Sequence, residues 1–510
     1  MKNKKLLSNV GSILFENKVL ILFAVLCIFC ISYSEVNVSY VSGELFTRLG
    51  RNACLVLSLI IPVLAGLGLN FGIVVGAIAS QIAIFWVVHW GFTGITGFML
   101  TALIATPLAI IFGILVGILY NKTKGSEMIT GLVLGYFADG LYKLFVLYII
   151  GGVIPFDDPN LLPRGFGLKN AFDLTGSLKY SLDDISLLEV VTVAAVIFVI
   201  AQIAIIIYKS VKKQALGLTK RIVGIVIAAV LGGVSFAVTS VVTTLETAIA
   251  NGTGVPAIVN KLAPVCYKLD NLYGQTRLLL SDAIFLFGVV AAIVFAVKLV
   301  QALISKKSFT RPLAGMIAMV LIIVLAMIPA VNAVTASVRI PACTYAMIFV
   351  FCAINNWLLS TKLGQDMRTV GQNRAVATSA GINVNRTRII AVCVSTVLAA
   401  WGQLIFLQNL GTFNTIQQQT NVGLYSIAAL LVGGASVQKA NNKQAVIGVI
   451  LFHTLFVVAP LAATKLVGDS AISEYIRMFL SYGVIAAALA MHAWKKVKKK
   501  FGNDKKAEVK

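Results

Sequence analysis

The chain has 510 residues, of which 59% are hydrophobic and 12% charged, and its net charge is +23. Ordinary soluble domains carry about 25% charged residues and a smaller apolar share, so the composition excludes a soluble globule and indicates a polytopic membrane protein. The positive charge alone would also fit nucleic acid binding, and only the placement of the basic residues along the chain separates the two interpretations.

A membrane-spanning helix needs about 20 mostly apolar residues. By that criterion we predict an all-α, polytopic helical bundle with about 14 transmembrane segments. Spans 72–88 and 421–438 are short and rich in glycine or polar residues, so either could be a broken or re-entrant segment. The predicted spans are 19–34, 52–69, 72–88, 95–120, 129–154, 185–208, 222–245, 278–300, 313–335, 340–361, 389–410, 421–438, 444–464 and 475–494.

The basic residues give the chain a predicted orientation. With the N-terminus in the cytoplasm, most Lys and Arg residues fall in the tails and cytoplasmic loops, as the positive-inside rule requires, and most acidic residues fall on the outer side. We therefore predict a multi-pass protein of the cell membrane with both termini cytoplasmic, and nucleic acid is not needed as a partner. The first apolar run lacks a clear cleavage site and is expected to stay as a helix. The tail 495–510 is expected to be solvated and to meet anionic lipid.

Catalytic and metal-binding residues are not expected. Cys27 and Cys30 have the spacing of a metal or redox pair, but they lie in an apolar run without a neighbouring His or acid, so burial is favoured. The three His residues are isolated from one another. No G-x-x-x-x-G-K-[ST] motif occurs, so the chain cannot itself hydrolyse ATP, and we expect it to bind no cofactor.

Residues 64–80 place several glycines around Asn70. Close helix packing is one explanation. The other is a helix interrupted near mid-membrane, where Asn70, Gly72 and Gly76 would face a polar path.

Asp139 and Lys143 form the only opposite-charge pair deep in an apolar segment, and their spacing of four places them on one helical face. They are either a structural pair buried between helices or part of the lining of a translocation path. The polar loop 155–184 that follows contains Asp157, Asp158, Asp183 and Asp184. It suits an external surface where a binding protein docks, although a plain solvated loop is an equal alternative.

The polar stretch 361–389 lies between two apolar runs and carries five basic residues against a single Asp366, which marks it as cytoplasmic. Asn373 is a good N-cap and Gly381 can end a helix in the left-handed conformation. The residues between them are small, notably Ala375, Ala377 and Ala380, so a second protein could approach the backbone closely. The stretch is either such a docking projection or an ordinary basic loop.

Further along, span 389–410 carries Gln403 and Asn409, and the segment after it contains Gly433, Gly434 and Ser436. Several of these short patterns resemble the membrane subunits of ribose-type and nucleoside-type ABC importers, the family that also includes branched-chain amino acid permeases. The GLNFG run at 68–72 is similar to that family's Gly-x-Asn-Ile-Gly pattern. Gly433, Gly434 and Ser436 match its Gly-Gly-x-Ser element. Its cytoplasmic loop is matched by Gly371, Asn373, Ala377, Ala380, Gly381 and Ile382.

In that family the cytoplasmic loop inserts a short coupling helix into a groove of the ATP-hydrolysing subunit. The resemblance therefore implies a permease subunit that forms the path for a small polar solute of the simple sugar or nucleoside class. The family often has Pro-Glu after the Asn, where this chain has Arg374-Ala375, so contacts of that Glu are not transferred. The implied coupling residues are Gly371, Asn373, Arg374, Ala375, Ala377, Ala380, Gly381 and Ile382, and the path candidates are Asn70, Gly72, Gly76, Asp139, Lys143, Gln403, Asn409, Gly433, Gly434 and Ser436.

The implied partners are ABC ATPase subunits, which hold ATP and Mg, a second permease subunit in a homodimer or heterodimer, an extracytoplasmic substrate-binding protein and the lipid bilayer. Against the family, the chain is expected to divide into the first part of the permease core (1–184), four inserted transmembrane helices (185–339), the second part of the core (340–494), which holds the coupling loop 362–388, and the basic tail (495–510). An ion-coupled secondary transporter or flippase is the alternative, and such carriers usually depend on membrane-embedded acids. A structural membrane assembly factor is a third.

Overall fold

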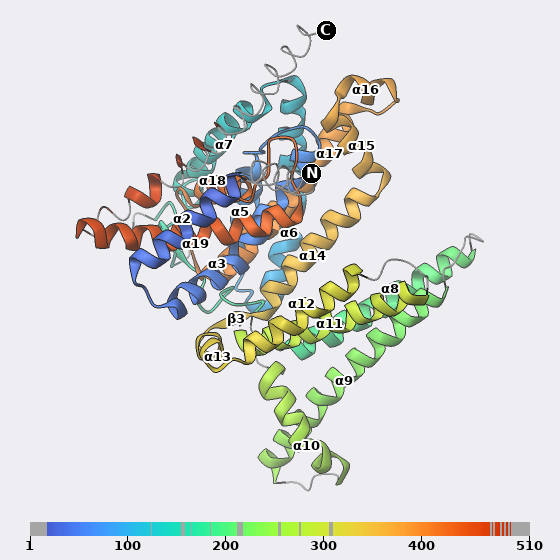
Figure 1. Ribbon diagram of the computed structural model, residues 1–510. Helices are drawn as coiled ribbons and strands as arrows, with labels where there is room; N and C mark the ends of the chain where they lie inside the picture. The colour runs from blue at the N-terminus through green and yellow to red at the C-terminus, as the bar shows by residue number, and fades with distance from the viewer. Residues whose placement is uncertain are drawn as a thin grey trace, which may run out of the picture. The chain divides into compact units, whose positions relative to one another are not determined.

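The computed structural model describes residues 18–469 except 124, 155–158, 164, 184, 212–217, 253–256, 275–276 and 305–309, together with 472, 475–479, 482–483, 486–487 and 490. Helices make up most of the described chain (Figure 1). The chain divides into two compact units: unit 1 comprises Met1–Ser181 with Ala346–Lys510, and unit 2 comprises Leu182–Tyr345.

Unit 1 is built from two stretches of the chain. Its first stretch contains α2 (Lys18–Ser34), α3 (Val38–Ser58), α4 (Ile60–Leu64), α5 (Ile73–His89), α6 (Gly94–Lys122), α7 (Glu127–Leu144), the π-helix η1 (Phe145–Ile149) and β1 (Ala171–Asp173). Its second stretch is entered through α14 (Ala342–Ser360) and contains α15 (Lys362–Gln372), α16 (Arg374–Ser379), α17 (Val384–Leu410), β4 (Thr412–Asn414), α18 (Gln418–Val432) and α19 (Asn442–Val467).

Small residues hold the centre of unit 1 together. The long helix α17 packs against α3, α5 and α6. A Cβ added at Gly76 of α5 would lie 2.6 Å from the Thr396 carbonyl oxygen of α17, so the two helices touch through their backbones. A cluster of buried alanines joins α5, α6 and α17 in the same way. Close approach through small residues is how helices associate in lipid, where apolar burial between them supplies little.

Unit 2 consists of α8 (Leu187–Val211), α9 (Leu218–Asn251), α10 (Ala257–Leu269), the π-helix η2 (Asp270–Gly274), β2 (Arg277–Leu279), α11 (Leu280–Ile304), α12 (Thr310–Met327), α13 (Pro329–Thr335) and β3 (Arg339–Pro341). Helix α8 packs on α9, and α11 packs on α12. The strands β2 and β3 pair antiparallel with Leu278 opposite Ile340. Many outward side chains of these helices are large and apolar.

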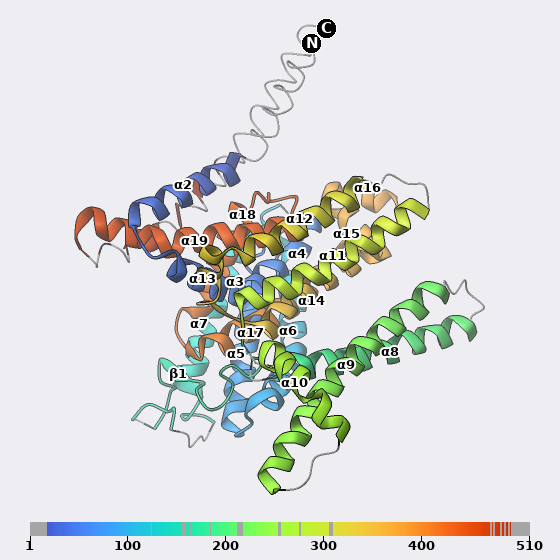
Figure 2. The same cartoon turned by 60° about the horizontal axis from the view of Figure 1, so that its bottom comes forward.

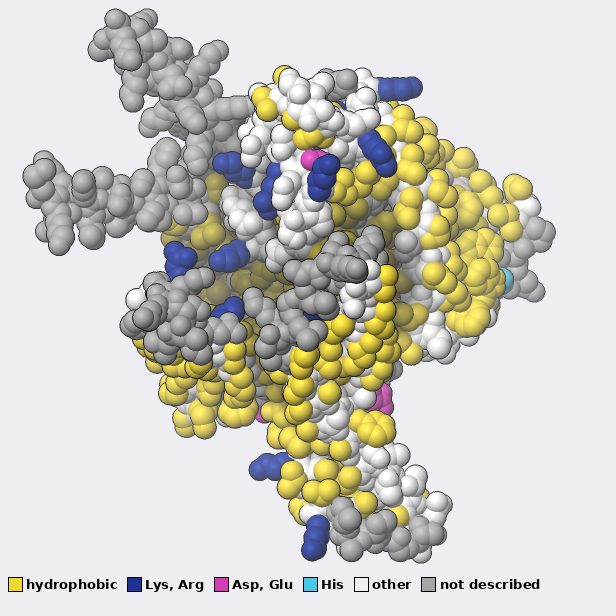
Figure 3. Space-filling view, turned by 90° about the vertical axis from the view of Figure 1, so that its right-hand side faces the viewer, with side chains coloured by type: hydrophobic (Ala, Val, Ile, Leu, Met, Phe, Trp, Pro, Cys, Tyr) yellow, Lys and Arg dark blue, Asp and Glu magenta, His cyan; other side chains and the backbone are white. Residues whose placement is uncertain are grey.

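The all-α membrane bundle predicted from the sequence is confirmed. Among the described residues, ten helices are long and apolar enough to cross a membrane, and Val19–Ser34 and Ile73–His89 are shorter apolar helices. Hydrophobic side chains cover much of the face shown in Figure 3, as a lipid-facing surface requires. The total of about 14 spans stays a prediction. Much of the predicted span 475–494 and all of the tail 495–510 lie outside the described residues.

Several predicted boundaries are wrong. The expected span 313–335 is broken, because α12 ends at Met327 and Pro329 begins the separate helix α13. The expected span 52–69 begins earlier, at Val38, and its helical part ends at Leu64. Helix α18 ends at Val432, where Gly433 follows, and not at 438. Helices α10 and α15 were not predicted, because both mix polar and apolar residues.

Candidate functional site

The docking segment, which we define as α15, α16 and the turn to Ile382, contains the short capped helix that its sequence predicts. The Oδ1 of Asn373 accepts hydrogen bonds from the backbone N–H groups of Ala375 (2.9 Å) and Val376 (3.2 Å), which caps α16. At the other end Gly381 has φ +76°, and the N–H of Ile382 donates to the Ala377 carbonyl at 3.0 Å. This is a Schellman-type stop, so both predicted ends of the short helix are confirmed.

Helix α16 turns Ala377 inward, half-buries Arg374 and turns its other residues outward. Ala377 is fully buried, whereas Ala375, Thr378, Ser379 and Ala380 are exposed. Val376 is 56% exposed although it is apolar. In Figure 2, α16 and β1 lie at opposite ends of unit 1. The outward face is therefore small and partly apolar, as a surface that contacts another protein would be.

Two glycines let the docking segment touch the turn 65–72 between α4 and α5. Gly66 has φ +74°, and a Cβ added to it would lie 2.7 Å from the Cα of Gly371. A Cβ at Gly371 would in turn overlap the Leu64 carbonyl oxygen. Backbone thus meets backbone here, and Gly371 is explained by this close approach.

An ion-pair cluster fixes the same segment from the other side. Oε1 of Glu127, the first residue of α7, accepts hydrogen bonds from Nη2 of Arg374 and from Nη2 of Arg388, each at 2.5 Å. Arg388 is fully buried, its Nη2 also donates to the Tyr120 carbonyl at 3.3 Å, and its Nε and Nη1 have no hydrogen-bond partner among the described residues. Nη2 of Arg374 also lies 3.4 Å from the Gly66 carbonyl oxygen. Neither Glu127 nor Arg388 is predicted from the sequence as a site residue.

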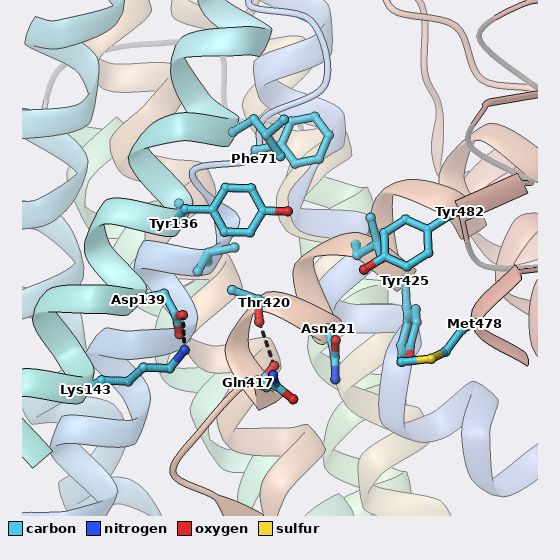
Figure 4. A pocket seen from close by; sticks show the side chains of 14 residues that line it. Phe71, Tyr136, Asp139, Lys143, Gln417, Thr420, Asn421, Tyr425, Met478 and Tyr482 are labelled. Carbon is cyan, nitrogen blue, oxygen red and sulfur yellow. Dashed lines mark hydrogen bonds and ion pairs between the residues drawn. The ribbon is translucent and has the colours of Figure 1, made fainter. Parts of the chain in front are cut away.

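A cavity of about 480 Å³ lies beside α7 and α18 (Figure 4). In the close-up, the Tyr136 ring projects into the cavity from α7, and Tyr425 and Tyr482 line its opposite side. The full lining consists of Phe71, Val74, Leu132, Gly135, Tyr136, Asp139, Lys143, Gln417, Thr420, Asn421, Leu424, Tyr425, Met478 and Tyr482.

The polar side of this cavity is organised by Asp139. Its Oδ2 lies 2.7 Å from Nζ of Lys143, and its Oδ1 accepts a hydrogen bond from Nε2 of Gln419 at 2.5 Å. Gln417 has a left-handed backbone, with φ +72°, which is uncommon for a residue other than glycine. Thr420 donates to the Gln417 carbonyl at 2.8 Å. Carboxylate, ammonium and hydroxyl groups opposite aromatic rings suit a small molecule with several hydrogen-bonding groups.

The structure does not bring the other predicted path residues into this cavity. Asn70 is buried: its Oδ1 accepts from the Gly72 N–H and the Tyr120 hydroxyl, and its Nδ2 lies 3.4 Å from the Ser395 hydroxyl. The helix is interrupted between Leu64 and Ile73, and the 65–72 turn lies beside the last turn of α6 and the docking segment, while a polar path at this turn stays a prediction. The reason for the interruption is that Gly66 and Gly68 take positive φ angles after α4 has ended.

The remaining candidates also occupy structural positions. Gln403 is fully buried and its side-chain amide has no hydrogen-bond partner among the described residues. Asn409 accepts a hydrogen bond from Nε of Arg51 at 3.0 Å. Gly433, Gly434 and Ser436 form the tight turn between α18 and α19, where Ser436 Oγ accepts from the Lys439 N–H. That these residues form part of a translocation path remains a prediction. Within the described chain, no three His, Cys, Asp or Glu side chains gather as a metal site.

Comparison with known proteins places these features in a family. The autoinducer 2 import system permease protein LsrC of Klebsiella pneumoniae is 36% identical over 94 residues, which is 18% of this chain and 26% of that protein. The ribose import permease protein RbsC of Escherichia coli K12 is 30% identical over 112 residues, 22% and 34% of the two chains. The xylose transport system permease protein XylH of Haemophilus influenzae is 35% identical over 91 residues, 18% and 24%. Each match covers at most about a third of the relative's length.

No solved structure matches the chain significantly. The sequence profile of the family described as "Branched-chain amino acid transport system / permease component" matches residues 222–489. The match begins inside the segment 185–339, so the idea that this segment is an insertion stays a prediction. Because the profile covers more than half of the sequence, this multi-pass membrane protein belongs to the family of branched-chain amino acid transport system permease components.

Proposed function

We propose that the chain is the transmembrane permease subunit of an ABC importer for a small polar solute of the simple sugar class. The printed names of the relatives concern import of autoinducer 2 and ribose and transport of xylose. The observation that carries the proposal is the capped, outward-facing helix α16 in a chain of this permease family. A separate ATPase subunit, which holds ATP and Mg, grips that helix.

The cavity beside α7 supplies the solute site in this proposal. Tyr136, Tyr425 and Tyr482 offer ring faces to the apolar face of a sugar, and Asp139 and Lys143 offer charged hydrogen-bonding groups to its hydroxyls. A second permease subunit completes the path, and an extracytoplasmic binding protein delivers the solute. Binding of ATP to the partner biases the pore because the ATPase contacts α16 differently with and without nucleotide.

The proposal also includes an orientation. Helix α16 faces the cytoplasm of the cell, where the ATPase is found, and both chain termini lie on that side. The proposed residues of contact with the ATPase are Gly371, Asn373, Arg374, Ala375, Ala377, Ala380, Gly381 and Ile382. Of these, Ala377 and Gly371 hold the docking segment in place, because both face the rest of unit 1.

Purification of the tagged chain from native membranes tests the proposal directly. The expected result is co-purification of a chain with a G-x-x-x-x-G-K-[ST] motif. Solute uptake by proteoliposomes that contain the assembly should require ATP, which binds to its ATPase subunit. A Ser379→Cys variant should react with a thiol reagent added from the cytoplasmic side only. Active uptake by an assembly without any nucleotide-hydrolysing subunit, or labelling of residue 379 from outside, would reject the importer assignment.

A further inference from the structure

Helix α7 connects the docking segment with the cavity through one continuous stripe of residues. Glu127, Gly131, Gly135, Asp139 and Lys143 follow one another in steps of four, so each lies beside the previous one and the stripe winds around the helix by about 40° per step. The first four of these residues are buried. Glu127 pairs with Arg374 of the docking segment, and Asp139 and Lys143 line the cavity. At a rise of about 1.5 Å per residue, Glu127 lies about 18 Å from Asp139 and about 24 Å from Lys143 along the helix axis.

The middle of this stripe lies beside the 65–72 turn. A Cβ added to Gly131 would lie 3.5 Å from the Phe71 Cβ and would overlap the Tyr120 hydroxyl. A Cβ added to Gly135 would lie 3.6 Å from the Phe71 carbonyl oxygen. No side chain of α7 therefore separates the helix from a turn that also touches Gly371. Neighbouring elements of this kind transmit displacement because protein interiors have few voids to absorb it.

The Glu127 carboxylate connects α7 with the docking segment at the cytoplasmic end of the helix. The Glu127 side chain is 8% exposed, so it is poorly accessible to another protein, whereas the Arg374 side chain is 36% exposed and lies on the docking segment. The same carboxylate oxygen binds the buried Arg388 at the start of α17. Glu127 Oε2 also accepts the Gly125 N–H at 3.1 Å, which orients the carboxylate.

We propose that Glu127 is a positioning residue that transmits movement of α16 along α7 to Asp139 and Lys143 in the cavity. The inference rests on the proposed function, since it assigns the path by which the ATPase state reaches the solute site. When the ATPase moves α16, the Arg374–Glu127 ion pair carries α7 with it. The side chains at the other end of α7 then change their distance from Gln417 and Tyr425 across the cavity.

The test uses the complete assembly in proteoliposomes, with Glu127→Gln as the variant. This change keeps the size of the side chain and removes its charge. We expect the ATPase subunit to remain bound and ATP to be hydrolysed, while the solute transported per ATP falls about tenfold or more, as loss of a charge-assisted hydrogen bond allows. The matched control is Glu44→Gln, which removes an acid paired with Arg48 within α3 and should leave the ratio unchanged.

A second measurement follows the far end of α7 directly. Tyr136 is 61% exposed and lines the cavity, so Tyr136→Cys reports on access to it. The labelling rate at residue 136 is compared, by peptide mass spectrometry, between the nucleotide-free and the vanadate-trapped assembly. With Glu127 present, trapping should change the rate. With Glu127→Gln, the rate should be the same in both states.

Because Glu127→Gln leaves the buried Arg388 charge without its partner, Arg374→Gln serves as a second variant that keeps the Glu127–Arg388 pair. If the two residues act through each other, the double variant should lose no more coupling than either single one. Wild-type coupling and wild-type nucleotide dependence at residue 136 in both single variants would overturn the inference. Such a result would reject the role of Glu127 and leave the importer proposal intact. The importer proposal itself would be rejected if the wild-type assembly contained no ATPase.

Discussion

The contact between Gly66 and Gly371 allows a quantitative test by the substitution Gly66→Ala. Gly66 has φ +74°, a conformation that costs a residue with a Cβ about 1–2 kcal/mol. The new Cβ would also lie 2.7 Å from the Gly371 Cα, about 1 Å short of the optimal separation of two carbon atoms. Overpacking of this kind costs about 1–3 kcal/mol. The variant should therefore lose about 2–5 kcal/mol of stability, or push the docking segment away from the turn.

A matched variant separates the two causes. Gly468, at the end of α19, has φ +79° and open space around an added Cβ, so Gly468→Ala should lose only the backbone part, about 1–2 kcal/mol. Thermal unfolding of both variants in detergent measures the stability, and uptake per ATP in proteoliposomes measures the coupling. Gly66→Ala should lower both quantities, and Gly468→Ala should lower the melting temperature less and spare uptake. Equal effects of the two substitutions would refute the role of the backbone contact.

Three further substitutions have defined outcomes. Gly381→Val places a β-branched residue at φ +76° with no neighbour within 4 Å, so it should insert normally yet uncouple ATP hydrolysis from uptake; normal coupling would reject the need for this helix stop. Asn70→Ala removes the acceptor of the Gly72 N–H and the Tyr120 hydroxyl and should cost about 1–3 kcal/mol in thermal unfolding, whereas an unchanged midpoint would contradict the packing role. Asp139→Ala alone should destabilise more than Asp139→Ala with Lys143→Ala, because the single change leaves one charge unpaired. The double variant should fold but lose uptake, and full uptake by it would remove the pair from the solute path.

Local interactions were readable from the sequence. The Asn373 cap and the Gly381 stop depend on residues within one or two helical turns, and so does the Asp139–Lys143 pair. The amphipathic helices α10 and α15 could not be predicted from long apolar runs, because their polar and apolar residues alternate. Proline at 329 is a helix-start signal, but it lies within an apolar stretch that reads as continuous.

The tertiary part of the site could not be read in the same way. Glu127 is separated from Arg374 by 247 positions and from Arg388 by 261, and an acid just before an apolar run is also what an ordinary helix start requires. Arg374 is predicted from the sequence as a coupling residue, but nothing near it in the sequence points to Glu127. The cavity combines α7, α18 and residues near 480, and nothing in the local pattern of Tyr136 or Tyr425 pairs them. The buried glycines at 131 and 135 could signal close packing, but not the partner.

The short ladder between β1 and β4 joins two segments far apart in the chain. Phe172 lies opposite Phe413, and the backbone bonds from Leu174 to Gly411 and from Thr415 to Asn170 extend the pairing on either side. Beyond β4 the chain runs directly into Gln417, Thr420 and Asn421 on the cavity wall. The segment around β1 is consequently joined to that wall by main-chain hydrogen bonds and by the chain that follows β4. A displacement of β1 therefore has to be accommodated by β4 and by the residues that follow it on the cavity wall.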